Sequence, residues 1–319
     1  MKEIYVQAKG GLGYNFALAR VIKAVQNKDD KVHFSVISPY YDVFQASGID
    51  YYKPEEIRDF IFDAKEKGAT IVAHRIYDSS RFILKEVNYK NAFLELFGYK
   101  DNYITDEEYN NLDLDVLKYF PNTANAIAEF DKALNGKKFF LVQFCGGQSP
   151  LEVPINGDWT KKPYDYEHEP LKRHYPKEKA TEFVRLFKEK HPDIELVQFA
   201  LPNEPIIDGC LCFALPYMTY YLIADKAEGA ITIDSSLAHI VTGSTKVLTI
   251  WGHSLPDSFG YSCNKNIIQK CRRDDILYFT DLGPSGAKIT YIEPDKLLNE
   301  IENYFELFKD VEPIEKIEE

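Results

Sequence analysis

One stretch of the sequence joins a strand, a polar turn and a helix, and it constrains the fold more than any other. Residues 229–233 are apolar and typical of a buried strand, and a second apolar strand covers residues 246–251. The turn between them reads Asp234-Ser235-Ser236-Leu237-Ala238-His239. Asp and Ser are favoured at helix starts, and a helical pattern continues to Val241. A strand, a helix and a strand in this order predict a parallel sheet with the turn at its carboxyl edge.

The composition indicates a folded protein that does not bind nucleic acid. The chain has 319 residues, of which 45% are hydrophobic and 14% aromatic, enough for two domains with separate cores. Its net charge of -12 argues against nucleic-acid binding, which needs a basic surface. The sequence opens with Met1-Lys2-Glu3 and shows no signal peptide and no membrane span. We therefore expect a cytoplasmic protein, and we leave open peripheral attachment to the inner membrane.

The five cysteines indicate reduced thiols rather than a disulfide framework. Their odd number and the missing secretory signal both favour this interpretation. The spacing of four of them does not match a zinc finger. A metal site built from these four remains open: Cys210, Cys212, Cys263 and Cys271.

The alternation of strands and helices occurs twice along the chain. In the first third, strands at residues 3–7, 31–37 and 70–73 alternate with helices at residues 15–26 and 55–67. The pattern starts again after Asn135-Gly136-Lys137-Lys138, which we interpret as a linker. The second series has strands at residues 139–144 and 194–199, and helices at residues 176–190 and 217–224. This order predicts two α/β domains with parallel sheets.

Several polar or glycine-rich segments lie at the predicted ends of strands. Gly10-Gly11-Leu12-Gly13 stands between the first strand and the first helix, where glycine lets the backbone approach a ligand. Gly146 and Gly147 follow the strand at residues 139–144, and Glu204 follows the strand at residues 194–199. Arg173 precedes a helix, and its guanidinium matches the geometry of a phosphate. Because the carboxyl ends of parallel strands share an edge, we expect the segments of the second half to meet in one crevice.

These segments together resemble the glycosyltransferase family of ADP-heptose:lipopolysaccharide heptosyltransferases. The match is mainly in the second half, and the segment Trp251 to Asp257 is also similar to the family's pattern. The segments that carry the resemblance are Gly11-Leu12-Gly13, Arg173-His174-Tyr175-Pro176, Leu201-Pro202-Asn203-Glu204 and Asp234-Ser235-Ser236-Leu237-Ala238-His239.

The resemblance implies the GT-B architecture, in which two Rossmann-like domains face each other across a cleft. It places an acceptor-side domain at residues 1–136 and a nucleotide-sugar-binding domain at residues 137–294. It also implies a final helix at residues 295–310 that packs back toward the first domain, followed by an acidic tail at residues 311–319. The reaction would invert the anomeric centre without a metal or other cofactor, using a nucleotide-sugar donor and a glycan or glycolipid acceptor.

The resemblance also assigns roles to single residues. It implies that Arg173 contacts the diphosphate of the donor and that Glu204 contacts the ribose. The remaining donor-binding residues would be Gly146, Gly147, Asp234, Ser235, Ser236 and His239. Gly11 and Gly13 would form a loop on the acceptor side.

One position departs from the family's pattern, and it concerns the catalytic base. The family has Asp directly after Gly-x-Gly, whereas this chain has Tyr14. The pKa of an ordinary Tyr is about 10, so Tyr14 is a poor base. His74 stands just past the strand at residues 70–73, with Asp78 four residues on, and we expect the base there. Asp42, after the second strand, is a weaker candidate.

Two other functions fit the same sequence. A nucleotide-sugar epimerase on this architecture would bind the donor without an acceptor. A non-catalytic nucleotide-sugar-binding protein would explain the loss of the family's Asp at Tyr14.

Overall fold

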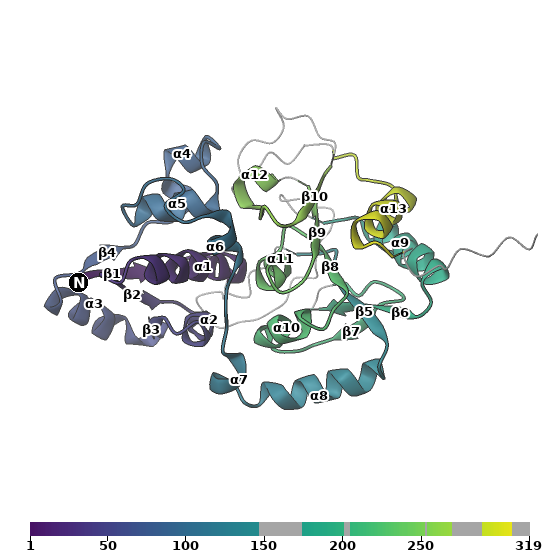
Figure 1. Cartoon of the computed structure of the whole chain (residues 1–319), viewed down its shortest axis with the longest axis horizontal. Coiled ribbons are helices and arrows are strands. Elements are labelled where there is room, and N and C mark those ends of the chain that lie inside the picture. The colour runs from purple at the N-terminus through teal and green to yellow at the C-terminus, as the bar shows by residue number, and fades with distance from the viewer. Residues whose placement is uncertain (147–173, 201–204, 253, 270–288, 308–319) are drawn as a thin grey trace, which may run out of the picture.

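The computed structural model has two α/β domains, each built on a parallel sheet (Figure 1). The structure describes residues 1–146, 174–200, 205–252, 254–269 and 289–307. The first sheet has the strand order β3-β2-β1-β4 and the second has the order β10-β9-β8-β5-β6-β7. Every pair of neighbouring strands in these two sheets is parallel. The fold class predicted from the sequence is therefore confirmed.

The first domain carries the four-stranded sheet and seven of the labelled α-helices. Its strands are β1 (Lys2–Gln7), β2 (Val32–Ile37), β3 (Asp50–Tyr52) and β4 (Thr70–Val72). Its helices are α1 (Leu12–Lys28), α2 (Tyr41–Ala46), α3 (Ile57–Glu66), α4 (Ser80–Ile83), α5 (Tyr89–Leu96), α6 (Asp106–Asn110) and α7 (Val116–Tyr119). Short 3-10 turns precede α3 and α4, at Pro54–Glu56 and Ile76–Asp78.

The second domain carries the six-stranded sheet. Its strands are β5 (Lys138–Gln143), β6 (Ile194–Phe199), β7 (Leu211–Phe213), β8 (Gly229–Ile233), β9 (Val247–Trp251) and β10 (Lys265–Ile268). Its helices are α9 (Lys177–Lys190), α10 (Tyr217–Ala224), α11 (Ser236–Val241), α12 (Pro256–Phe259) and α13 (Pro294–Phe305). The central strands β6, β8 and β9 are buried along their whole length, as expected when helices cover both faces of a sheet.

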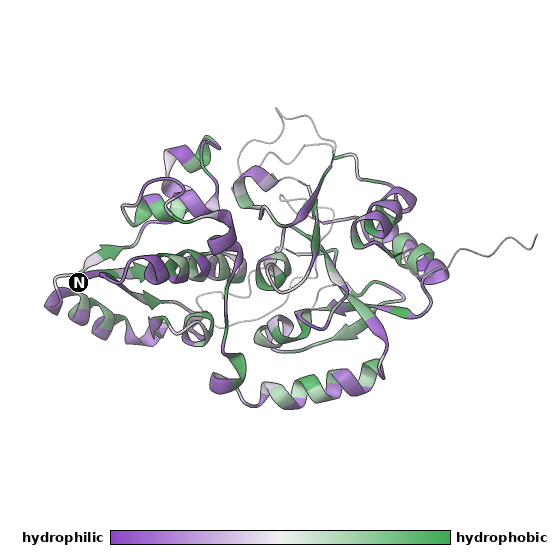
Figure 2. Cartoon of the chain, viewed as in Figure 1, coloured by the Kyte–Doolittle hydropathy of each residue, from purple (hydrophilic) through white to green (hydrophobic). Residues whose placement is uncertain are grey.

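The distribution of hydropathy explains why these elements pack as layers. Figure 2 shows apolar residues concentrated in the strands of both sheets, while helices such as α1 alternate between apolar and polar residues. On α1, the buried side chains include Phe16, Val21, Ile22 and Val25, which pack into the largest hydrophobic cluster. That cluster also contains Val197 and Trp251 of the second sheet, so one continuous core joins the two domains. No described helix is long and apolar enough to cross a membrane.

Helix α8 (Thr123–Leu134) lies on the second domain, although its residues fall within the range expected for the first. The ring of Phe130 is 5.2 Å from that of Phe139 on β5 and 4.9 Å from that of Phe213 on β7. The residues interpreted as a linker instead end this helix, since Asn135 and Gly136 both have left-handed backbone, with φ of 51° and 76°. The chain therefore crosses between the domains before α8, next to α7 (Figure 1).

The final described helix packs on the second domain and not on the first, where we expected it. The buried side chains of α13 include Leu297, Leu298 and Ile301, and they share a hydrophobic cluster with Phe183 and Phe187 of α9. Figure 1 shows α13 beside α9, on the side of the second sheet away from α1. The physical reason is that the apolar face of α13 packs against the apolar face of α9, which belongs to the second domain. The expected tail at residues 311–319 lies outside the described residues.

Candidate functional site

The Asp234 turn connects the carboxyl ends of three neighbouring strands. Asp234 and Ser235 are buried directly after β8. The hydroxyl of Ser235 donates to Gln143 Oε1 at the end of β5, at 2.6 Å, and the hydroxyl of Ser254, which follows β9, donates to the carboxylate of Asp234. Ser235 occupies the position before α11, but its side chain makes no cap hydrogen bond there. These polar groups fix the turn to the sheet.

Gly146 lies against this turn, as the convergence of strand ends predicted. A Cβ added at Gly146 would lie 3.2 Å from the Cβ of Ser235. The Gly146 amide donates to Nδ1 of the buried His174 at 3.2 Å, which ties the end of β5 to the segment before α9. Ser236, the first residue of α11, is half-buried. Three predicted donor-binding residues, Gly147, Arg173 and Glu204, lie outside the described residues.

His239 stands at the contact between the two domains. Its Nδ1 is 2.8 Å from the hydroxyl of Tyr261. Its ring stacks on that of Tyr89 from the first domain, with centroids 5.9 Å apart and planes inclined by 28°. A Cβ added at Gly13 would lie only 2.5 Å from His239 Cδ2. The structure thus brings together Gly13 and His239, which the sequence analysis assigned to opposite sides of one cleft.

Tyr14 occupies the position of the family's Asp as a buried aromatic side chain. Its ring covers Gly10, where an added Cβ would come within 2.1 Å of Tyr14 Cγ. It packs edge-on against Phe93 at 5.1 Å and lies 6.3 Å from the ring of Tyr77. Burial raises the pKa of Tyr14 well above its usual value, and the neighbouring Tyr77 adds to the rise. Tyr14 is therefore a packing residue. A Cβ added at Gly11 would meet no atom within 4 Å, so this glycine faces open space.

The two expected base residues, His74 and Asp78, are both exposed. The carboxylate of Asp78 accepts from the Arg75 amide at 2.8 Å and lies 3.8 Å from the Arg75 guanidinium. Its charge also contributes to the raised pKa of Tyr14, which places Asp78 in the surroundings of that hydroxyl. Within the part of the chain that the structure describes, His74 makes no hydrogen bond and no ion pair.

Asp42 combines burial with a contact across the domain interface. It lies in the first turn of α2, after the carboxyl end of β2. The hydroxyl of Tyr217, at the start of α10 in the second domain, donates to its carboxylate. Burial raises the pKa of Asp42, while the Tyr217 hydroxyl partly offsets this rise. Among the three base candidates, Asp42 is the one that touches the second domain.

Arg20 is a buried residue of the interface that sequence reasoning missed. Its guanidinium donates to the carbonyl oxygens of His239 at 3.0 Å, Thr242 at 2.6 Å and Asn110 at 2.5 Å. The first two carbonyls end α11, so a cation on α1 caps the helix that carries His239. The sequence contained a signal for the burial of Arg20, because this residue lies four positions from both Phe16 and Ala24 on the apolar face of α1.

The described residues contain no group of three or more His, Cys, Asp or Glu side chains arranged to hold a metal. Cys210 directly precedes the edge strand β7, Cys212 lies within it, and Cys263 follows α12. Cys271 lies outside the described residues. The expectation of a metal-independent reaction stays a prediction.

Two parallel α/β domains that meet through the helices following their strand ends define the GT-B class, and the solved structures with this fold include heptosyltransferases. ADP-heptose LPS heptosyltransferase II of E. coli is 12% identical, with 96% of this chain and 99% of that chain covered and a TM-score of 0.56. A glycosyl transferase family 9 protein of Veillonella parvula is 13% identical, with 96% and 98% covered and a TM-score of 0.61.

A third similar structure is TibC of enterotoxigenic E. coli, described as an iron-containing dodecameric glycosyltransferase. It is 13% identical, with 96% of this chain and 76% of that chain covered and a TM-score of 0.60. No protein-family model matches the sequence, and no curated protein matches it either. The resemblance found in the sequence is thus confirmed for the fold.

Proposed function

We propose that this chain is a glycosyltransferase that moves a sugar from a nucleotide-diphosphate donor to a hydroxyl of a glycan or glycolipid. One observation carries the proposal: Gly146, Asp234 and Ser235 meet at one sheet edge, and the same turn brings His239 against Gly13 of the first domain. Heptosyltransferases share this fold, and one structure of TibC is a complex with ADP-D-beta-D-heptose. A heptose or a related sugar on a nucleoside diphosphate is the donor that this supports.

The proposed reaction inverts the anomeric carbon. The acceptor oxygen forms a bond to that carbon on one face while the bond to the diphosphate breaks on the other. The diphosphate leaves with the electron pair, and a base takes the proton of the acceptor hydroxyl. Arg173 and the polar groups of the Asp234 turn would stabilise the charge that builds on the diphosphate, without a requirement for metal.

The base would belong to the first domain, at the carboxyl edge of its sheet. His74 and Asp78 follow β4, and Asp78 is close enough to Tyr14 to influence its pKa. Asp42 follows β2 and already contacts the second domain through Tyr217. Turnover measured at saturating donor separates the three candidate bases. Substitution of the residue that acts as the base lowers turnover about 100-fold or more and leaves donor affinity intact. Full activity of His74→Ala and Asp78→Asn, with loss in Asp42→Asn, would assign the role to Asp42.

The function is tested first by donor binding. Calorimetry with ADP and ADP-heptose should show binding to the wild-type chain. Arg173→Ala should weaken it by roughly 1.5–3 kcal/mol, the value of a charge-assisted hydrogen bond. Arg173→Lys should recover only part, because the planar fork is lost. Arg185→Ala is the matched control, since Arg185 is exposed on α9 and pairs with Glu182 and Glu189. Unchanged affinity in Arg173→Ala would contradict the proposed role of this residue.

Product analysis separates transfer from the two alternatives. A transferase releases nucleoside diphosphate only when an acceptor is present, apart from slow hydrolysis. An epimerase would convert the donor sugar with no acceptor added. A binding protein would retain the donor unchanged with every acceptor offered.

A further inference from the structure

The imidazole of His239 is enclosed by groups from both domains. Its exposed fraction is 6%, and the ring of Tyr89 from the first domain stacks on it with centroids 5.9 Å apart. The ring edge that carries Nε2 faces the glycine loop, since a Cβ added at Gly13 would lie 3.3 Å from Nε2. The other nitrogen, Nδ1, lies 2.8 Å from the hydroxyl of Tyr261. The two nitrogens therefore face different groups, Nδ1 a buried phenol of the second domain and Nε2 the loop of the first.

The surroundings of Tyr261 decide which group donates in its hydrogen bond with His239. Burial raises the pKa of Tyr261 above its ordinary value of about 10, and the nearby Arg20 only partly offsets this rise, so the hydroxyl keeps its hydrogen at neutral pH. The guanidinium of Arg20 lies 5.4 Å from the centroid of the Tyr261 ring. Because a cation attracts the phenol oxygen and repels its hydrogen, the hydrogen is directed away from Arg20 and toward Nδ1 of His239. The Tyr261 hydroxyl is therefore the donor and Nδ1 the acceptor.

An acceptor at Nδ1 places the hydrogen of the neutral imidazole on Nε2. One nitrogen of a neutral His ring donates and the other accepts, and the hydrogen bond that one of them makes fixes the role of the other. In His239 the N–H group is thus on the side of Gly13 and the first domain. A nitrogen that already holds a hydrogen donates it to an oxygen and does not take a second proton from a hydroxyl. This tautomer suits contact with a phosphate or sugar oxygen and does not suit a general base.

We propose that Tyr261 is a positioning residue that holds His239 as the neutral tautomer with its hydrogen on Nε2, so that His239 donates a hydrogen bond to the nucleotide-sugar. The proposal rests on the glycosyltransferase function proposed above. It adds that His239 serves as a hydrogen-bond donor and not as the base, and that its role depends on a residue outside the Asp234 turn.

A two-bond hydrogen–nitrogen NMR correlation of the full chain, labelled at histidine, measures the tautomer directly. A pH of about 8 is above the ordinary His pKa of about 6.5, and His239→Gln identifies the signals of this ring by their loss. In the wild type, Nδ1 should give the signal of a bare nitrogen and Nε2 that of an N–H group. In Tyr261→Phe the ratio of the two tautomers should fall roughly 2- to 10-fold, the value of one neutral hydrogen bond. A wild-type ring with its hydrogen on Nδ1, or an unchanged ratio in Tyr261→Phe, would overturn the proposal.

Calorimetry with ADP-heptose tests whether this tautomer matters for donor binding. Tyr261→Phe should weaken the binding roughly 2- to 10-fold, because part of the chains then present a bare Nε2 to the ligand. In a chain that already carries His239→Ala, Tyr261→Phe should cause no further loss, since the effect passes through the imidazole. An equal loss in both backgrounds would show that Tyr261 acts only through the fold, and it would overturn the positioning role.

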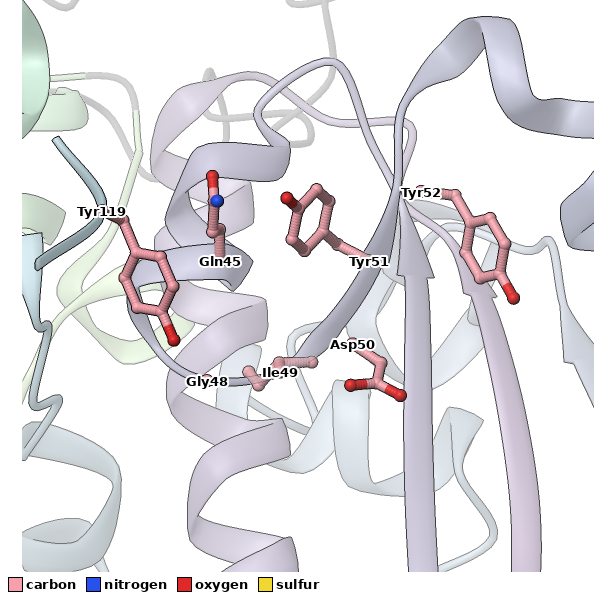
Figure 3. A pocket seen from close by; sticks show the side chains of 7 residues that line it. All are labelled: Gln45, Gly48, Ile49, Asp50, Tyr51, Tyr52 and Tyr119. Atoms are coloured by element: carbon pink, nitrogen blue, oxygen red, sulfur yellow. The ribbon is translucent and has the colours of Figure 1, made fainter.

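Two other tyrosines serve as controls. Tyr221→Phe is the matched one, because the Tyr221 hydroxyl donates to the carbonyl of Leu112 at the same distance of 2.8 Å. Tyr119 lines a pocket of about 500 Å³ between α2, β3 and α7, whose lining includes neither His239 nor Tyr261 (Figure 3). Phenylalanine at either control position should leave the tautomer ratio and the ADP-heptose affinity unchanged. A chain that binds neither ADP nor ADP-heptose would refute the proposed function, whereas binding with full affinity in Tyr261→Phe would overturn this inference alone.

Discussion

Replacing Arg20 is the most direct test of how the two domains are joined. Its guanidinium is fully buried and donates to three carbonyl oxygens, those of Asn110, His239 and Thr242. Two of these carbonyls end α11 in the second domain, and the third ends α6 in the first. Arg20→Ala removes all three donors. It leaves the carbonyls of His239 and Thr242 without them in a buried place, whereas the Asn110 carbonyl is partly buried.

The expected loss follows from these contacts. A hydrogen bond from a charged donor contributes about 1.5–3 kcal/mol, so three give roughly 4.5–9 kcal/mol. The variant also avoids the desolvation of a buried guanidinium, which costs several kcal/mol in the native protein. The net loss in free energy of unfolding should therefore be about 3–5 kcal/mol, in line with breaking other buried charge interactions.

Urea denaturation followed by circular dichroism measures this loss. Arg20→Met separates hydrogen bonding from packing, since it fills most of the space but donates nothing, and it should still lose about 2 kcal/mol or more. Lys28→Ala is the matched control on the same helix: Lys28 pairs with Glu108 of α6 at the surface, and its removal should cost at most about 1 kcal/mol. A loss below about 1 kcal/mol in Arg20→Ala, equal to that of Lys28→Ala, would refute the argument.

Three further substitutions test the interface and the site. Gly13→Ala places a methyl group 2.5 Å from His239 Cδ2 and should cost about 1–3 kcal/mol in a thermal melt, and an unchanged melting temperature would show that the contact is loose. Tyr261→Phe removes the hydroxyl 2.8 Å from His239 Nδ1 and should cost about 1 kcal/mol, with a shifted imidazole NMR signal as the direct readout. Asp42→Asn tests a pH effect: burial raises the pKa of Asp42 above 3.8, so its contribution to stability is full below that pH and falls as pH rises through the raised pKa. The stability of Asp42→Asn should therefore improve relative to the wild type as pH increases, and a constant difference between about pH 4 and 8 would contradict this.

The strands predicted from the sequence include all the central strands of both sheets and one short edge strand, β4. β6 and β8 have the predicted bounds, and β2 differs by one residue. Strands β3, β7 and β10 were not predicted; they have three or four residues and lie at the ends of the two sheets. An edge strand pairs on one side and stays partly exposed, so it does not need the continuous apolar run that marks a central strand.

The site was predictable where it depends on strand ends and not where it depends on contacts between domains. The turn at Ser235 and the glycine at 146 follow neighbouring strands, so parallel topology alone brings them together. The contact of Tyr89 with His239 joins residues 150 positions apart, and no local pattern encodes it. Arg20 was missed for the same reason, because its acceptors are backbone carbonyls, which every residue has.

The Arg20 contact also sets an order of events during synthesis. Arg20 and Thr242 are 222 residues apart, and ribosomes add about 5–20 residues per second, so roughly 11–44 s pass between the two. During this interval the guanidinium can reach the Asn110 carbonyl of its own domain but neither carbonyl of α11, and the side of α1 that will face the second domain stays uncovered. The first domain therefore leaves the ribosome with an exposed apolar face around a charge that has one of its three carbonyl partners, and this is the period in which a chaperone would protect the nascent chain from aggregation.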